Sequence, residues 1–110
     1  GKETAAIDVE VLSLDDFVAR NPVPRLDAIK LLAQGEEWNV LQGARATIAK
    51  YRPKICFLYE PSYWQRQNLV LMDAVGFFKQ YGYTTYAVEF GPRREVTGEI
   101  DKGQVFLAAP

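Results

Sequence analysis

The spacing of apolar residues along the chain predicts strands alternating with helices. Isoleucine and valines alternate with acids over Ile7–Val11, a period of two that predicts a half-buried strand. More continuous apolar or β-branched segments predict four further strands, at Leu26–Ala33, Lys54–Tyr59, Tyr83–Val88 and Gln104–Ala108.

Helical spacing and cap signals occupy the segments between these strands. Ser13 is followed three residues later by Asp16, which resembles a capping box and predicts a short helix to about Arg20. Apolar stripes predict longer helices at Glu36–Tyr51 and Gln67–Tyr81. We expect Glu60–Trp64 to form a loop and residues 90–102 to form a polar connection.

The order of elements predicts the sheet. Two consecutive strand–helix–strand units favour parallel pairing through right-handed crossovers. No helix separates the last two strands, so we expect them to pair antiparallel. The apolar Lys54–Tyr59 strand is expected to be central. The prediction is an α/β chain of one domain, residues 1–110, with a small mixed sheet and helices on its faces.

Composition excludes several classes of function. The formal net charge is −1, which provides no field to attract nucleic acid or an anionic membrane. No apolar stretch approaches the length of about 20 residues that a membrane helix needs, and no signal peptide is evident, so we expect a cytoplasmic protein.

Residue usage narrows the chemistry further. The chain has no histidine and one cysteine, so His-dependent nucleophilic catalysis and a zinc site are not expected. Cys56 lies in an apolar strand and is interpreted as a buried core thiol.

Several short motifs occur together in a characteristic order. They are Leu14-Asp15-Asp16-Phe17, Ile29-Lys30, Gly35-Glu36-Glu37, Val40-Leu41-Gln42-Gly43-Ala44, Pro53-Lys54-Ile55 through Glu60, and Tyr81-Gly82-Tyr83. This series resembles the C-terminal half of FkbM-type S-adenosylmethionine-dependent methyltransferases over roughly residues 9 to 90. The positions that match family residues most closely are Asp15, Lys30, Gly35 and Glu37.

The resemblance implies the later strands of a class I methyltransferase fold, which is Rossmann-like. That fold holds its cofactor on a glycine-rich turn after the first strand, where the backbone approaches the ligand closely. The glycines near the C-terminus are scattered and are interpreted as caps and turns. The chain alone is therefore expected to bind no cofactor, and S-adenosylmethionine is expected only if the missing half is supplied.

Two positions depart from the family pattern. The family has an aspartate where Leu32 stands and a glutamate where Gln34 stands. Both positions therefore carry uncharged residues in this chain. They lie at the end of a strand, where α/β folds commonly place groups that face the ligand. The departure argues against catalysis by the isolated chain.

A candidate pocket lies after the central strand. Glu60 ends that strand, and Tyr59, Tyr63 and Trp64 surround it with aromatic rings. The segment is interpreted either as a pocket wall or as a loop that packs back onto the sheet. Glu37 and Asp15 also have structural interpretations, because both lie in the first turn of a predicted helix.

Two functions remain open. The first is part of an FkbM-like methyltransferase that methylates a hydroxyl of a small molecule or saccharide. The second is a non-catalytic interaction module derived from that fold. In the parent fold the Leu26–Ala33 strand is flanked by another strand, so we expect its edge to be covered either by the Ile7–Val11 strand or by a second chain. We therefore expect this edge to mediate self-association or to receive a missing N-terminal half.

Overall fold

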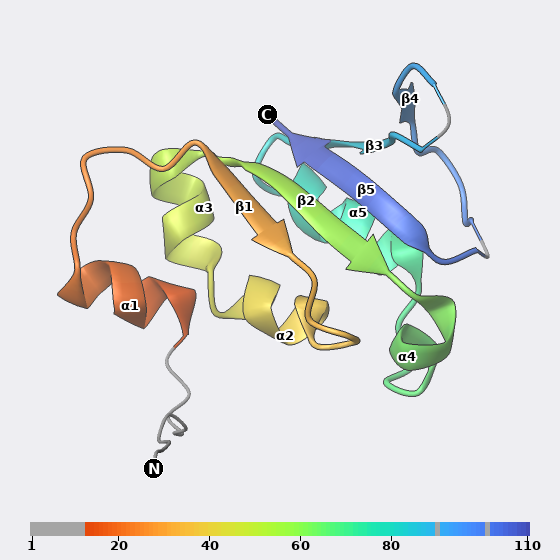
Figure 1. The fold of residues 1–110 in the computed structure, drawn as a ribbon, viewed down its shortest axis with the longest axis horizontal. Helices are drawn as coiled ribbons and strands as arrows, with labels where there is room; N and C mark the ends of the chain where they lie inside the picture. The colour runs from red at the N-terminus through yellow and green to blue at the C-terminus, as the bar shows by residue number, and fades with distance from the viewer. Residues whose placement is uncertain (1–12, 90, 101) are drawn as a thin grey trace, which may run out of the picture.

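The computed structural model describes residues 13–89, 91–100 and 102–110. The predicted strand at Ile7–Val11 lies outside this range. Helices and strands follow one another along the chain (Figure 1), and their bounds are α1 Leu14–Arg20, β1 Ala28–Leu31, α2 Glu37–Gln42, α3 Arg45–Tyr51, β2 Lys54–Tyr59, α4 Pro61–Gln65, α5 Leu71–Lys79, β3 Thr84–Ala87, β4 Arg94–Glu95 and β5 Gln104–Ala109.

The strands form a mixed five-stranded sheet in the order β1-β2-β5-β3-β4. β1 and β2 pair in parallel, and β5 pairs antiparallel with both β2 and β3. The predicted mixed sheet, the central position of β2 and the antiparallel pair of the last two long strands are therefore confirmed. The expected parallel pairing of β2 with β3 is wrong, because β5 inserts between them.

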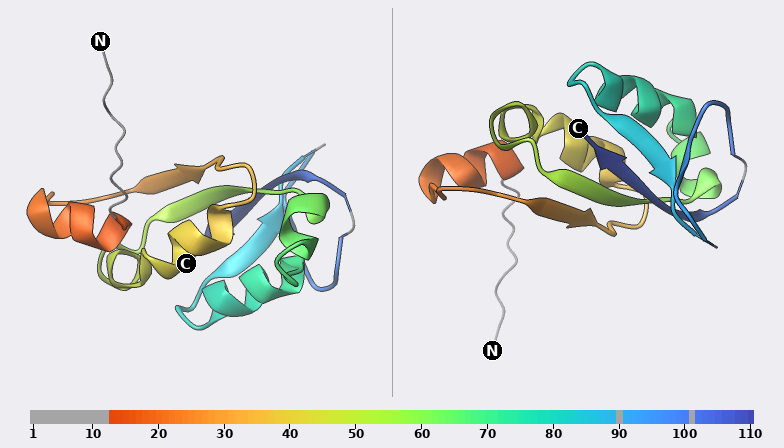
Figure 2. Two further views of the ribbon diagram at one scale, coloured as in Figure 1. Left: turned by 90° about the horizontal axis from the view of Figure 1, so that it is seen from below. Right: turned by 90° about the horizontal axis from the view of Figure 1, so that it is seen from above.

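Helices α2, α3 and α5 lie on the same face of the sheet (Figure 2). Burial along β2 alternates accordingly, with Ile55, Phe57 and Tyr59 fully buried toward these helices. Within the described residues no helix covers the opposite face, so the expectation of helices on both faces is not met there. Cys56 is only half-buried, which corrects its interpretation as a core thiol.

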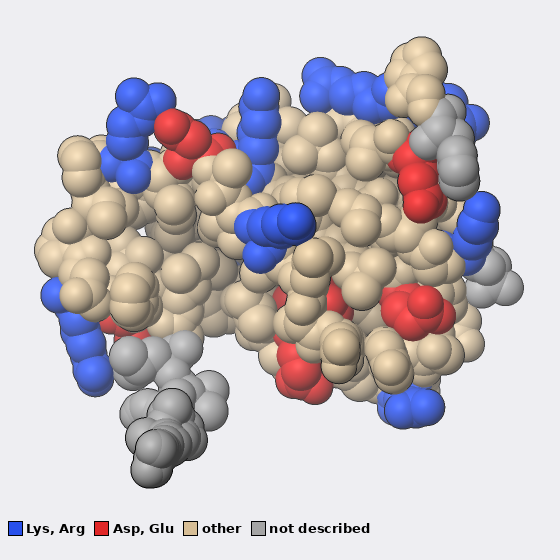
Figure 3. Space-filling view, in the orientation of Figure 1, with Lys and Arg blue, Asp and Glu red and all other residues tan. Residues whose placement is uncertain are grey.

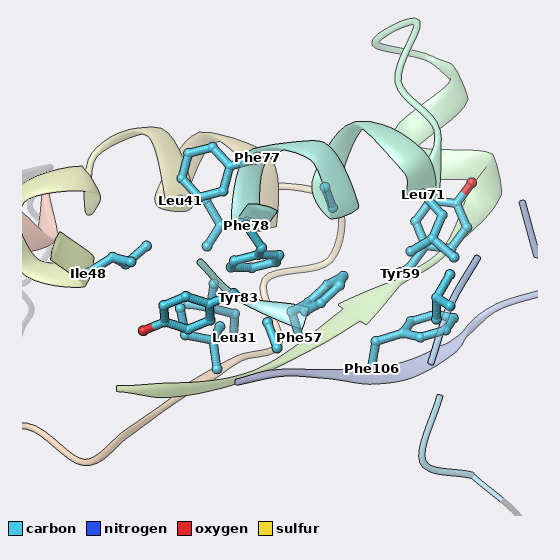
Figure 4. Packing of buried hydrophobic residues seen from close by; sticks show 14 of the residues in the cluster. Leu31, Leu41, Ile48, Phe57, Tyr59, Leu71, Phe77, Phe78, Tyr83 and Phe106 are labelled. Atoms are coloured by element: carbon cyan, nitrogen blue, oxygen red, sulfur yellow. The ribbon is translucent and has the colours of Figure 1, made fainter. Parts of the chain in front are cut away.

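The core between sheet and helices is aromatic. The ring of Phe57 packs against Phe78 at 5.4 Å and against Phe106 at 5.8 Å between centroids. Figure 4 shows these rings lying between α5 and the strands. Each fully buried side chain of this kind contributes about 1.5–3 kcal/mol, and favourable ring pairs add about 0.5–1.5 kcal/mol.

The predicted helix over Glu36–Tyr51 is two helices, α2 and α3, broken at Gly43 and Ala44. The break lies where the N-terminus of α1 packs. A Cβ atom on Gly43 would meet the Cβ of Ser13 at 2.8 Å. The backbone N–H of Asp15 also donates to the Gly43 carbonyl at 2.9 Å. Contact with a segment distant in sequence therefore divides the helix.

The segment between β2 and β3 also differs from its prediction. Glu60–Trp64 is not a loop, because Pro61 opens the short helix α4, at a position where proline is favoured. Asn68 has a left-handed backbone with φ 60°, so the second helix begins at Leu71 rather than at Gln67. In the predicted polar connection, β4 pairs with β3.

The charged side chains are spread over the molecule. In the face shown in Figure 3, Lys and Arg side chains are separated by neutral surface and by Asp and Glu. No helix in the described parts of the chain has the length and apolar character needed to cross a membrane. Beside β1, the described residues place one neighbouring strand, β2, so β1 lies at the sheet edge.

Candidate functional site

Parallel pairing brings two loops to the same edge of the sheet. β1 ends at Leu31 and β2 ends at Tyr59, and both carboxyl ends lie on that edge. The loop of residues 32–36 and the segment of residues 60–67 are in direct contact there, since the Gln67 side-chain amide donates to the Gly35 carbonyl at 2.8 Å. In open α/β sheets this edge is where ligands bind.

The first loop is held by a buried carboxylate. Glu37 is the first residue of α2 and is fully buried. Its Oε2 accepts a hydrogen bond from the Ala33 N–H at 2.7 Å, and its Oε1 accepts one from the Gly35 N–H at 2.9 Å. Glu37 therefore lies in the helix first turn, as expected, and it also fixes the chain that leads out of β1.

The second contact between the loops is steric. Gly35 is buried and has φ 101°, a backbone conformation that favours glycine. A Cβ atom at this position would lie 2.9 Å from the Cβ of Tyr63. The family-matched Gly35 therefore allows the two loops to approach closely.

A hollow of about 310 Å³ opens where the two loops meet. It is lined by Gln34, Gly35, Glu36, Tyr63, Arg66 and Gln67. The guanidinium of Arg66 lies over the Tyr63 ring, 5.4 Å from the centroid. The Glu36 carboxylate accepts a hydrogen bond from the Asn39 side chain at 2.8 Å, on its own helix.

The four residues of the predicted pocket do not converge on one site. Tyr63 lines the hollow. Trp64 and Tyr59 are buried in the core and pack edge to face at 5.1 Å. The partly buried carboxylate of Glu60 lies next to Gly103, where an added Cβ would collide with its Oε1. The segment thus provides one pocket wall residue and two core residues.

The remaining family-matched residues lie away from the hollow. Asp15 accepts hydrogen bonds from the Ala46 and Thr47 N–H groups at 3.0 and 2.8 Å, so it caps α3 rather than its own helix. Ser13 caps α1 by accepting from the Asp16 N–H at 3.1 Å, as predicted. Lys30 is exposed on β1.

The two residues that replace family acids both lie in the loop that follows the carboxyl end of β1. Leu32 is 51% exposed, and Gln34 lines the hollow with a left-handed backbone of φ 49°. The N–H groups of Ala33 and Gly35 are already bonded to Glu37, so they are not available to cradle a ligand. Among the described residues, these two N–H groups are therefore bonded within the loop and helix start themselves. In the same residues no cluster of three or more His, Cys, Asp or Glu side chains can hold a metal.

Sequence reasoning missed two residues that organise this region. Gln67 was assigned to a helix, but its amide bridges the two loops. Glu99 was assigned to a polar connection, but it accepts from the Leu71 and Met72 N–H groups at 2.8 and 3.2 Å, at the start of α5. The sequence around Gln67 and Glu99 does not predict these contacts, because the groups that they bond in these contacts are 27 to 32 residues away.

Comparison with known proteins identifies the family. Residues 1–85 of the 110-residue chain match the model of the methyltransferase FkbM domain. Comparisons with curated proteins and with solved structures found no match. The family match includes both strand ends that form the hollow. The chain belongs to the FkbM methyltransferase domain family.

Proposed function

We propose that this chain forms the acceptor-binding wall of an FkbM-type O-methyltransferase, whose substrate is a hydroxyl of a small molecule or saccharide. The supporting observation is the pair of loops at the carboxyl ends of β1 and β2. Glu37 and Gln67 hold these loops through hydrogen bonds to Ala33 and Gly35. A pocket wall fixed in this way positions a substrate at little entropic cost.

The methyl donor, S-adenosylmethionine, is held elsewhere in this proposal. The neutral Leu32 and Gln34 and the occupied loop N–H groups support this division. Another segment of a longer protein, or a second chain, supplies the donor site, and the Leu26–Ala33 edge is where it pairs. A free thiol at Cys56 suits a reducing compartment such as the cytoplasm.

Calorimetric titration with S-adenosylmethionine tests the proposal. We expect no heat of binding with the chain alone and saturable binding with any longer protein in which it occurs. Tight binding by the isolated chain would contradict the division of the site. Absence of binding in every form of the protein would overturn the proposal of a methyltransferase.

The second candidate is a non-catalytic module that pairs through β1. It is favoured by Leu32, which is 51% exposed where the family carries an acid. This reading predicts dimers or strand addition at the β1 edge. Sedimentation at high concentration distinguishes the module from the methyltransferase. If every form of the protein is monomeric and a form of it transfers methyl groups, the module hypothesis is contradicted.

A further inference from the structure

Arg66 is the only cation among the six residues that line the hollow. Among the described residues, an ion pair joins Arg25 and Asp27, and none involves Arg66. Its guanidinium rests over the Tyr63 ring, which orients the fork of N–H donors. Among the described residues, the hollow thus contains a cation that forms no ion pair.

The one acid of the hollow, Glu36, forms no ion pair with Arg66. The Glu36 carboxylate accepts from the Asn39 amide at 2.8 Å and stays on its own helix. Gln67 is equally committed, since its amide donates to the Gly35 and Tyr63 carbonyls. Gln34, which also lines the hollow, adds a neutral amide with both donor and acceptor atoms.

We propose that this hollow binds a small molecule of about monosaccharide size that carries an oxyanion, either a carboxylate or a phosphate. Arg66 pairs with the oxyanion, because its planar fork matches both groups. The exposed side of Tyr63 contacts the body of the ligand. A hollow of about 310 Å³ is at the lower end of the range for small-molecule sites, which suits a ligand of this size.

The inference rests on the proposed function in one respect, since the bound molecule would be the methyl acceptor. Its binding requires no methyl donor. It is therefore measured without S-adenosylmethionine, and its failure is separate from failure of the methyltransferase proposal.

Calorimetric titration of the full chain with three ligands tests the inference. Glucose, glucuronate and glucose 6-phosphate share a sugar ring and differ in charge. We expect at least one charged sugar to bind about tenfold or more tightly than glucose, the effect of one charge-assisted contact of about 1.4 kcal/mol. Preference for one of the two charged sugars assigns the oxyanion as carboxylate or phosphate.

Three variants provide the controls. Arg66→Gln should abolish the preference for the charged sugar, and Glu36→Gln should strengthen its binding by removing a nearby negative charge. Arg20→Gln makes the same charge change as Arg66→Gln but on α1, at the other end of the molecule (Figure 1), and should have no effect.

Three outcomes would overturn the inference. They are no binding of either charged sugar, equal binding of all three sugars, or a charge preference that survives in the Arg66→Gln variant. Arg66 is exposed, so this variant is expected to fold, and an unchanged unfolding transition verifies it.

Discussion

At the scale of single residues, the central feature is a buried carboxylate bonded to main-chain N–H groups. Glu37 is completely shielded from water, and its carboxylate accepts hydrogen bonds from the Ala33 N–H and the Gly35 N–H. Two charge-assisted hydrogen bonds offset the cost of burying the acid. Glu37 therefore ties the loop after β1 to the start of the helix that follows it.

Replacing Glu37 by glutamine tests this role. Glutamine keeps one acceptor oxygen and turns an amide N–H₂ toward a backbone donor, so one N–H is left unpaired. We expect the free energy of unfolding to fall by about 1–3 kcal/mol, measured by urea denaturation. The neighbouring Glu36→Gln, which is exposed, should change it by less than about 0.5 kcal/mol. Equal effects at the two positions would contradict the assigned role.

Residue identity alone predicted part of this site. The place of Glu37 in a helix first turn and of Gly35 before it followed from the sequence. The hydrogen bonds of Glu37 did not, because a helix first turn offers an acid several partners. The contact of Gly35 with Tyr63 joins positions 28 apart, and such proximity depends on how β1 and β2 pair.

At the scale of elements, α1 and α3 are joined by one side chain. Asp15 accepts from the N–H groups of Ala46 and Thr47 and from the Thr47 hydroxyl at 2.6 Å. The carboxylate thus satisfies the orphan donors at the start of α3, where the helix dipole also favours negative charge.

Removing this cap has a predictable cost. Asp15→Ala should lower the free energy of unfolding by about 1–2 kcal/mol, the usual range for losing an N-cap side chain. Asp16→Ala, an adjacent and exposed acid on the same helix, is the matched control and should cost less than about 0.5 kcal/mol. Chemical denaturation of both variants checks the difference, and a reversed order would refute the cap.

The elements themselves were largely predictable, and their interruptions were not. Continuous apolar and β-branched segments located β1, β2, β3 and β5, because strands of this kind pack against the core. The break between α2 and α3 depends on Ser13 and Asp15, which approach from a different helix. The late start of α5 depends on a left-handed turn at Asn68, which apolar spacing does not reveal.

At the scale of the whole molecule, the buried tyrosine Tyr83 makes the stability of the fold depend on pH. Tyr83 is buried and donates to the Pro53 carbonyl at 2.6 Å. Burial raises the pKa of Tyr83, while the nearby Arg52 guanidinium acts in the opposite direction. The folded chain therefore retains this proton at a pH where the unfolded chain loses it.

The sign of the effect follows from this difference. The contribution of Tyr83 is complete below the unfolded pKa of about 10 and is lost as pH rises through the higher folded value. We expect stability to decline above about pH 10, with a smaller decline in Tyr83→Phe. Urea denaturation from pH 8 to 11 measures it, with the exposed Tyr63→Phe as control. Identical profiles for wild type and Tyr83→Phe would contradict the assignment.

The sheet order was the feature of the whole molecule least accessible from the sequence. A strand at the end of the chain inserts between β2 and β3, which removes their expected pairing. Both arrangements bury the same apolar strands, so periodicity does not distinguish them. The family resemblance was accessible, because its motifs lie in continuous segments of the chain.

The most direct test of the account is transfer of a labelled methyl group from S-adenosylmethionine to a sugar hydroxyl. The measurement uses the chain and any longer protein that contains it. The account predicts no transfer by the chain alone, transfer by a longer form, and at least a tenfold loss in that form on Arg66→Gln but not on Arg20→Gln. Transfer that is indifferent to Arg66, or absent in every form, would contradict it.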